Sequence, residues 1–307
     1  MNSLHTLIRT LQSSAKWAAL LPGPAEDAHF YIRRGNHKDL LFIFPAGCRR
    51  PTMVIKQPVA VEDASRLERE FHRLSLMKNR FAPPITGIPK VFDYLSFEGR
   101  NVLAMPCFEG RAMAAILAHP ARRFSTPAWT AWLDRAAAWL LDFQGKTLCT
   151  HEGAASFVSH HLLSGMAPEF REKLFGRKFP ACGQHGDFNP ANILFHGESP
   201  LVLDWEWSEW PGLPLIDLYN LAIRSVMLRD QLGRQRGRMP LLRDAQAVLA
   251  STSPEYTFLR KWLPRFEQQL GMDRDTSTVL FHIVLEHMLT SSEDRKSAAG
   301  FTMEELS

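Results

Sequence analysis

The 307-residue sequence has few cysteines, little net charge and no long apolar run. Its four cysteines, Cys48, Cys107, Cys149 and Cys182, are widely spaced and form no C-x-x-C pair, which argues against a zinc site and against a disulfide scaffold. No apolar run approaches the roughly 18 residues that a membrane-spanning helix needs. The first residues lack the charged stretch and apolar run of a secretory signal. We therefore expect a reducing, cytoplasmic location and no transmembrane segment.

The composition is that of an ordinary folded protein, with 45% hydrophobic and 22% charged residues. The net charge of +4 is unevenly divided, with 15 Lys/Arg against 9 Asp/Glu in residues 1–105 and 21 against 23 in residues 106–307. A basic first third suits a polyphosphate ligand, but nucleic acid or acidic lipid equally well. Its basic residues are dispersed and form no recognition motif, so we expect no nucleic-acid partner.

An amphipathic helix is predicted near the N-terminus, because Leu4, Leu7, Ile8 and Leu11 fall on one helical face. We expect this face to pack against the body of the protein. Contact with a membrane surface is the alternative that the sequence leaves open.

The first third reads as strands, one helix and further strands. Residues 61–79 have helical periodicity, with Leu67, Phe71, Leu74 and Met77 at helical spacing. Residues 35–39 form a polar turn that makes a hairpin of the strands around it. The predicted strands are residues 29–34, 40–45, 52–57, 90–97 and 101–108.

From about Phe108 the sequence becomes mostly helical. Thr126 followed by Pro127 predicts a helix start, with a capping hydroxyl before a proline at the first helical position. Residues 185–205 differ, because a polar loop is followed by a strand, a turn and a second strand. Helix resumes at residues 217–228 and is expected to continue to the end of the sequence.

The most informative stretch is HGDFNPANILFHGESPLVLDWE, which runs from His185 to Glu206. It places Asp187 and Asn192 on one polar loop and Asp204 at the end of a hairpin. Phosphoryl transfer needs a group that takes or orients the proton of the acceptor hydroxyl, and oxygen ligands for magnesium. Two carboxylates and an amide in this arrangement meet both needs. The same residues would also suit a plain loop with turn caps.

HGDFNPANIL followed by VLDWE resembles the catalytic loop and metal-binding strand of the aminoglycoside phosphotransferase and choline kinase family. The resemblance implies that Asp187 is the catalytic base, that Asn192 and Asp204 bind Mg²⁺, and that His185 braces the loop. It also implies ATP, or alternatively GTP, as the phosphoryl donor, and a small molecule with a hydroxyl group as the acceptor.

The resemblance further implies an α+β, protein-kinase-like bilobal fold. Residues 1–105 would form an N-lobe, with a small antiparallel sheet and one helix that bind the nucleotide, preceded by the N-terminal helix. Residues 106–307 would form a larger, mainly helical C-lobe with the catalytic loop and the acceptor-binding helices.

Upstream residues match the family in order. Lys56, at the end of a strand, corresponds to the lysine that pairs with the nucleotide phosphates, and a carboxylate of the next helix would fix its position. Glu70 is the preferred partner, and Glu68 stays open. The segment NVLAMPCFEGRAM resembles the linker between lobes, so that Met105 and Cys107 would border the nucleotide base.

Two further points follow from the resemblance. Asp217 corresponds to the helix-starting aspartate that braces the catalytic loop. The chain has no G-x-G-x-x-G loop, which departs from protein kinases. Gly35 and Asn36 could still form the tight turn over the phosphates, and Lys38 could add positive charge there.

The sequence thus predicts an ATP-dependent phosphotransferase that acts on a sugar, amino sugar or amino alcohol. The alternative is a catalytically silent, kinase-like nucleotide-binding or scaffold protein. Glu206 and Glu209 are candidate acceptor-side carboxylates, and Trp205, Trp207 and Trp210 either wall the acceptor pocket or pack in the core. The identity of the acceptor and the oligomeric state stay open.

Overall fold

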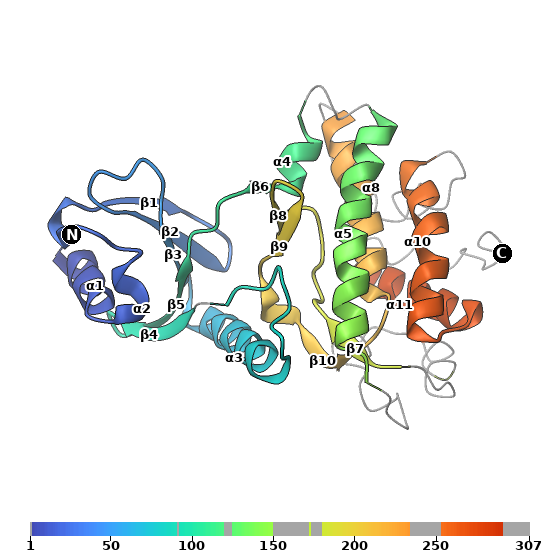
Figure 1. Ribbon diagram of the computed structural model, residues 1–307, viewed down its shortest axis with the longest axis horizontal. Helices are drawn as coiled ribbons and strands as arrows, with labels where there is room; N and C mark the ends of the chain where they lie inside the picture. The colour runs from blue at the N-terminus through green and yellow to red at the C-terminus, as the bar shows by residue number, and fades with distance from the viewer. Residues whose placement is uncertain are drawn as a thin grey trace. The chain divides into compact units, whose positions relative to one another are not determined.

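The computed structural model describes residues 2–90, 92–119, 125–149, 172, 180–233 and 253–290 (Figure 1). It divides into two compact units, of which the first is Met1–Gly110 with Asp204–Glu206 and the second Arg111–Leu203 with Trp207–Ser307. The sequence placed the division five residues earlier, after residue 105. The intervening residues stay with the first unit because the Cys107 N–H donates to the Thr52 carbonyl at 2.8 Å and Arg50 pairs with Glu109 at 3.1 Å.

The first unit is built on a five-stranded antiparallel sheet with the order β1-β2-β3-β5-β4. The strands are β1 (His29–Arg33), β2 (Lys38–Phe44), β3 (Met53–Pro58), β4 (Asp93–Phe97) and β5 (Arg100–Pro106). All five strands predicted from the sequence are present. The second begins two residues earlier than predicted, because Lys38 and Asp39 pair with Pro58 and Gln57 of β3.

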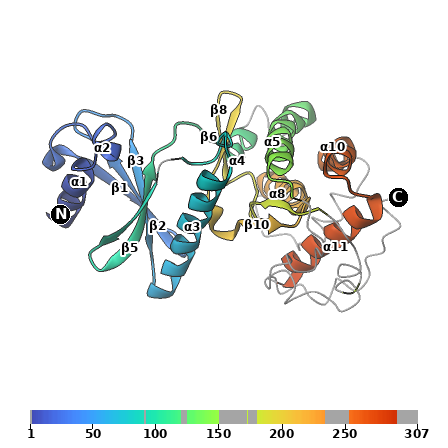
Figure 2. The same cartoon turned by 60° about the horizontal axis from the view of Figure 1, so that its bottom comes forward.

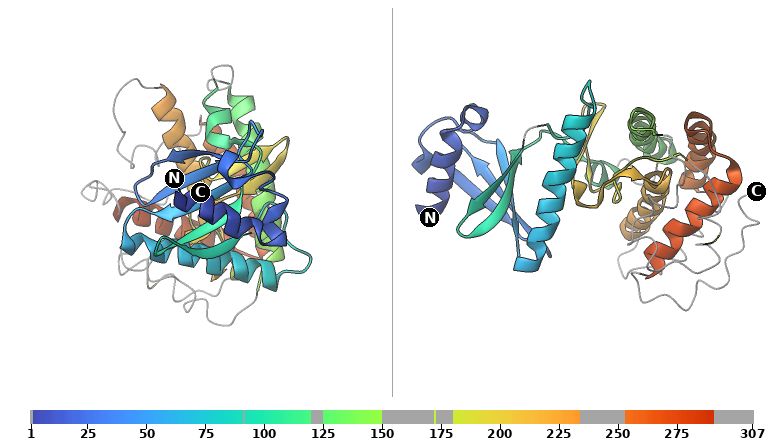
Figure 3. Two further views of the ribbon diagram at one scale, coloured as in Figure 1. Left: turned by 90° about the vertical axis from the view of Figure 1, so that its left-hand side faces the viewer. Right: turned by 90° about the horizontal axis from the view of Figure 1, so that it is seen from below.

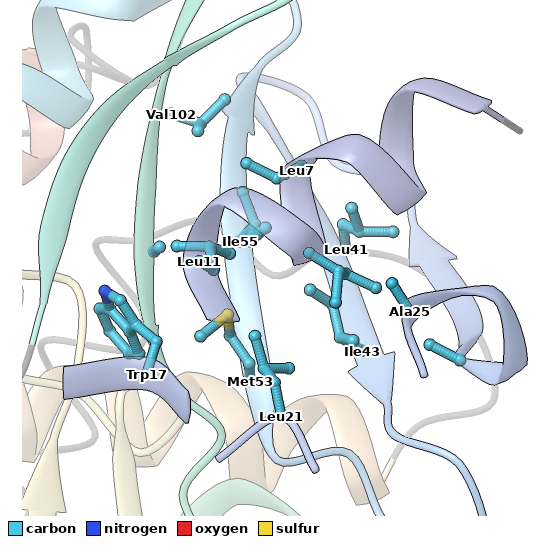
Figure 4. Close-up of a cluster of buried hydrophobic side chains, with 13 residues drawn as sticks. Leu7, Leu11, Trp17, Leu21, Ala25, Leu41, Ile43, Met53, Ile55 and Val102 are labelled. Carbon is cyan, nitrogen blue, oxygen red and sulfur yellow. The ribbon is translucent and has the colours of Figure 1, made fainter. Parts of the chain in front are cut away.

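One face of this sheet is apolar and is covered by the N-terminal helices α1 (Asn2–Gln12) and α2 (Ala15–Ala18). Figure 4 shows the side chains of these helices directed at residues of β2 and β3. The buried cluster contains Leu7, Ile8, Leu11, Trp17, Leu21, Ala25, Ala28, Leu41, Ile43, Met53, Ile55, Val102 and Ala104. The apolar face of α1 therefore packs on the protein, as expected, and is not left for a membrane surface.

The opposite face of the sheet carries helix α3 (Ala64–Arg80), and α1 and α3 lie on opposite sides of the strands (Figure 3). Since successive side chains of a strand point to opposite faces, Ile55 faces α1 while the next residue, Lys56, faces α3. Helix α3 begins at Ala64 and not at residue 61, because Val61–Asp63 forms a 3₁₀ turn. The Asp63 carboxylate accepts the Ala60 N–H at 3.2 Å and closes that turn.

The second unit is mainly helical. Helices α5 (Thr126–Lys146), α8 (Ile216–Gly233), α10 (Pro254–Leu270) and α11 (Arg274–Thr290) pack on one another (Figure 2). The remaining elements are β6 (Arg111–Ala112), α4 (Met113–Leu117), β7 (Cys182–Gln184), β8 (Ile193–His196), β9 (Ser199–Val202), the 3₁₀ turn Trp205–Trp207 and β10 (Glu209–Gly212). Strands β6, β8 and β9 form one small sheet, and β7 pairs with β10.

The start of α5 corrects one prediction. Ser125, and not Thr126, is the N-cap, since its hydroxyl accepts the Ala128 N–H at 3.4 Å. Thr126 is therefore the first helical residue and Pro127 the second. The helix predicted at residues 217–228 is α8, which begins one residue earlier, and residues 291–307 lie outside the described residues. Among the described helices, none has the length and apolar character to cross a membrane.

Candidate active site

The polar loop of the second unit holds the carboxylate of Asp187 between two side-chain amides. Asn189 Nδ2 donates to Asp187 Oδ1 at 2.8 Å, and Asn192 Nδ2 donates to Asp187 Oδ2 at 2.8 Å. Both amides also donate to the Asp187 carbonyl, at 3.1 and 3.0 Å. The side chain is therefore fixed in one orientation while staying partly exposed. Asn189 lies two residues after Asp187, and this spacing is the turn signal that places its amide against the carboxylate.

His185 holds this loop in place through hydrogen bonds of both ring nitrogens, the bracing role that the resemblance implies. Its Nε2 lies 2.8 Å from the Leu203 carbonyl, and its Nδ1 lies 3.3 Å from the Asp187 N–H. A carbonyl can only accept and an N–H can only donate, so the proton belongs on Nε2. The buried imidazole thus links the loop to Leu203, the residue after β9.

Asp217, near the start of α8, fixes the same loop through its backbone. Its carboxylate accepts the N–H of His185 at 2.6 Å and that of Gly186 at 2.9 Å. Burial raises the pKa of Asp217 to about 7, although these backbone donors act in the opposite direction. This is the bracing arrangement that the resemblance implies for Asp217.

Gly186 is required by the geometry of the loop. Its φ of +83° lies in the left-handed region, and a Cβ there would come within 2.3 Å of the Trp207 carbonyl oxygen. Any side chain at this position would both strain the backbone and push against a neighbouring chain segment. The glycine before Asp187 is therefore a steric requirement of the bend.

Asn192 connects the loop to the hairpin of β8 and β9. Its carbonyl accepts the Leu203 N–H at 2.8 Å, which sets the residue before Asp204 against the start of β8. Its side-chain nitrogen donates hydrogen bonds to the carbonyl and to the carboxylate of Asp187. Its side-chain oxygen accepts no hydrogen bond from any residue that the structure describes.

Asp204 follows β9 by two residues and belongs to the first unit. Its φ of 63° is unusual for a residue with a side chain and marks a sharp change of direction at the end of the hairpin. Its carboxylate contacts the ammonium of Lys56 and, at 3.0 Å, that of Lys38. Burial alone would raise the pKa of Asp204, but the two ammoniums outweigh it and hold the pKa well below its usual range.

Lys56, on β3, is also bound by helix α3. Its Nζ lies 2.6 and 2.9 Å from the two carboxylate oxygens of Glu70, and both side chains are almost fully buried. Burial would lower the pKa of Lys56, but the charges of Asp204 and Glu70 raise it above its usual value. Glu68, the alternative partner, is exposed and lies 3.8 Å from His72. The geometry settles the choice in favour of Glu70.

A chain of alternating charges extends from this centre within the first unit. Lys38 lies 3.7 Å from Glu206, Glu206 lies 3.8 Å from Arg66, and Arg66 lies 3.8 Å from Asp63. The role of Arg66 was missed, because Arg66 and Glu206 are far apart in the sequence and their contact leaves no local signal. Asp63, three positions before Arg66, was missed with it. Glu206, expected on the acceptor side, is instead engaged by cations of the first unit.

The residues proposed to border the nucleotide lie at two places in the first unit. Gly35 and Asn36 are in the turn between β1 and β2, and a Cβ at Gly35 would lie 2.3 Å from the Lys38 carbonyl oxygen. Met105 is the penultimate residue of β5 and has a buried side chain. Cys107 follows, half-buried, and burial raises the pKa of its thiol.

The tryptophans near Asp204 differ in how far they are buried. Trp205 is fully buried and therefore belongs to the core. Trp210 is partly buried, and its indole nitrogen donates to the Thr147 carbonyl at 2.9 Å. Trp207, also partly buried, packs its backbone against Gly186.

Comparison of the chain with models of known protein families identifies the family to which it belongs. The model of the phosphotransferase enzyme family, the APH family, matches residues 44–262, well over half of the chain and including the catalytic-loop motif. The chain belongs to this family. It is therefore a phosphotransferase of the small-molecule kinase type, whose acceptor is a hydroxyl group. No curated protein sequence matches the chain closely enough to add to this assignment.

Solved structures similar to this phosphotransferase share its fold across nearly the whole chain. Aminoglycoside phosphotransferase APH(3'')-Id from Streptomyces rimosus is 15% identical with a TM-score of 0.51, over 92% of this chain and 98% of that one. A thermostable mutant of aminoglycoside phosphotransferase APH(4)-Ia, in a ternary complex with ADP and hygromycin B, is 13% identical with a TM-score of 0.52, over 97% and 95%. The predicted α+β, kinase-like fold is thereby confirmed.

The donor atoms of this phosphotransferase suit a magnesium ion. Magnesium prefers oxygen ligands, above all carboxylates. Asp204 supplies a carboxylate whose pKa is held well below its usual range, and the Asn192 amide oxygen accepts no hydrogen bond from a described residue while its nitrogen donates to Asp187. These are the atoms that the sequence assigned to the metal.

Proposed function

We propose that this phosphotransferase moves the γ-phosphoryl group of ATP, or alternatively GTP, to a hydroxyl group of a sugar, amino sugar or amino alcohol. Magnesium assists and Asp187 is the base. The first unit binds the nucleotide and the second binds the acceptor. The observation that carries the proposal is the fixed carboxylate of Asp187, which takes one amide N–H on each oxygen.

Asp187 has the geometry of a base that orients an acceptor hydroxyl. Each carboxylate oxygen offers two acceptor directions, and the amides of Asn189 and Asn192 use one on each. No other hydrogen bond from a described residue reaches these two oxygens, so the remaining directions would be available to the proton of a substrate hydroxyl. Because the side chain is already held in place, little reorganisation is needed when that proton moves.

The charges of the first unit suit a polyphosphate. Glu70 fixes the Lys56 ammonium, which would pair with phosphate oxygens of the nucleotide. Asn192 and Asp204 would hold magnesium, which when bound neutralises charge that develops on the phosphates. The lysine would thus be oriented before the nucleotide arrives.

The base of the nucleotide would lie along residues 105–108. The Cys107 N–H is already donated to Thr52, so the backbone groups after it are the ones left to contact the base. The side chain of Met105 would form part of the surface beside it. Gly35 and Asn36 would form the turn over the phosphates.

The acceptor is proposed to be a hydroxyl compound with little positive charge, for which a sugar or glycan hydroxyl is the preferred class. Binding a polycation would require free carboxylates. In the described part of the second unit, many of them already face an Arg or Lys of the same unit. These pairs are Asp134–Lys261, Asp142–Lys146, Glu198–Arg135, Glu255–Arg229 and Glu267–Arg274.

The proposal is tested by a metabolite screen with purified protein, ATP and magnesium, read out as ADP release and as phosphorylated product. The wild type should turn over at least one hydroxyl compound. Asp187→Asn should reduce that rate by roughly 10²- to 10⁴-fold while still binding nucleotide. Asp142→Asn, which alters an exposed carboxylate on α5, is the matched control and should behave as the wild type.

The rival function is a catalytically silent nucleotide-binding or scaffold protein. Magnesium-dependent ATP binding without turnover of any compound in a broad metabolite panel would favour this rival over the enzyme.

The assignment of the base has its own contrary result. Near-normal turnover by Asp187→Asn would show that Asp187 is not the catalytic base.

A further inference from the structure

The absence of a glycine-rich loop leaves open which groups of the first unit meet the outer phosphates. The turn between β1 and β2 carries a single glycine, Gly35. Lys38, the first residue of β2, follows this turn directly. Its ammonium lies 3.0 Å from Asp204, a proposed metal ligand.

The register of the sheet explains why two lysines meet at one carboxylate. Leu40 of β2 pairs with Lys56 of β3, and paired residues share a face. Lys38 lies two residues before Leu40 and therefore projects to the same face as Lys56. Both ammoniums reach the same oxygen, Oδ1 of Asp204.

The two lysines differ in how fully their charge is compensated. Lys56 is 6% exposed and has a dedicated partner in Glu70, with both carboxylate oxygens within 2.9 Å. Lys38 is 20% exposed, and its second anion, Glu206, lies 3.7 Å away, beyond hydrogen-bond distance. Glu206 is also shared with Arg66. Lys38 is therefore the ammonium that depends most on Asp204.

We propose that Lys38 is a second polyphosphate-binding lysine, which supplies with a charged side chain what a glycine-rich loop supplies with backbone N–H groups. If the Asp204 carboxylate binds a divalent cation, it can no longer neutralise the ammoniums of both Lys38 and Lys56. A phosphate oxygen of the nucleotide would then be the anion that pairs with Lys38. The inference rests on the proposed function, because it assumes that a nucleotide binds the first unit. If Lys38 contacts the outer phosphates, the affinity for a nucleotide should rise with its number of phosphates, and part of that rise should be lost when Lys38 is replaced.

The test is calorimetric binding of ATP, ADP and AMP at fixed magnesium and salt, for the wild type, Lys38→Gln, Lys38→Arg and Lys90→Gln. Lys90 is an exposed lysine of the same unit that contributes no contact to this network, so its variant removes an equal charge elsewhere. Lys38→Gln should weaken ATP and ADP binding on the order of tenfold and leave AMP binding unchanged. Lys38→Arg should recover part of the loss, and Lys90→Gln should match the wild type.

Each contrary outcome has a distinct meaning. If the wild type binds ATP, and Lys38→Gln and Lys90→Gln bind it with equal affinity, the role of Lys38 would be overturned and the proposed function would stand. An equal loss for ATP, ADP and AMP would also overturn it, because it would show a disturbed site and no phosphate contact. Failure of the wild type to bind any of the three nucleotides would overturn both.

Discussion

Lys56 and Glu70 form a buried ion pair between β3 and α3, in which the ammonium contacts both carboxylate oxygens at 2.6 and 2.9 Å. The pair ties the helix to the strand that carries Lys56, the lysine proposed to bind phosphate. Its polar atoms lie away from solvent, so neither partner can be removed without leaving a buried charge. Stability and nucleotide binding are thus expected to depend on the same contact.

The first prediction concerns this pair. Glu70→Gln should lower the free energy of unfolding by about 3 kcal/mol, at the low end for breaking a buried pair because Lys56 keeps Asp204 as a partner. It should also weaken ATP binding, since the lysine loses its fixed position. Urea denaturation and ATP titration measure the two effects. Glu68→Gln, on the exposed side of the same helix, should change neither, and equal behaviour of the two variants would contradict the assignment.

The second prediction concerns Asp204. Asp204→Asn should raise the magnesium concentration needed for half-maximal ATP binding by at least the roughly 10- to 100-fold that loss of an outer-shell partner costs. Titration of magnesium at fixed ATP measures it. Glu26→Gln, which neutralises an exposed carboxylate of the same unit, serves as control. An unchanged magnesium dependence in Asp204→Asn would count against its role as a ligand.

The third prediction is a pH dependence set by Asp217. Burial raises its pKa from 3.8 to about 7, so the folded protein keeps a proton that the unfolded chain loses. The stabilisation from this group is full below about pH 4 and is lost as the pH rises toward 7. Over that window the free energy of unfolding should fall by up to about 1.4 kcal/mol per pH unit from this group alone.

Comparison with Asp217→Asn isolates that contribution. Urea denaturation from about pH 5 to about pH 8 should give a stability difference between wild type and variant that shrinks with rising pH and levels off above the folded pKa. A difference that stays constant across this range would show that Asp217 is already ionised in the folded protein.

The fourth prediction concerns the N-terminal helix. Ile8 is 1% exposed in the cluster between α1 and the sheet, so Ile8→Ala should lower the free energy of unfolding by about 2–5 kcal/mol. Thr10→Ala, on the solvent side of the same helix, should cost far less. Denaturant unfolding of both variants measures the contrast. Similar stabilities would mean that α1 does not hold the sheet in solution.

Local patterns predicted the elements well, because alternation and helical spacing are carried by neighbouring residues. The strands around Ile55 and Lys56 and the helix bearing Glu70 all follow from such spacing. Most of the errors lie at element ends, and the short strands β6, β7 and β10 were not predicted. At the start of α5 the adjacent hydroxyl residues Ser125 and Thr126 can both cap a helix, and the structure uses Ser125.

The candidate site was predictable where its residues share one loop and not where they converge from distant segments. Asp187 and Asn192 are five positions apart, and their contact follows from the turn. The approach of Lys38 to Asp204 joins residues with no local relation, so no pattern announces it.

The alternation along β3 has one further consequence. Ile55 lies in the apolar cluster and Lys56 at the ion pair, so hydrophobic burial and placement of the lysine are specified by a single register. A slip of one residue would bury an ammonium beneath α1 and set an isoleucine against Glu70. A shifted strand pairing would therefore cost free energy on both faces of the sheet, and the register that forms the apolar core also directs Lys56 toward Glu70.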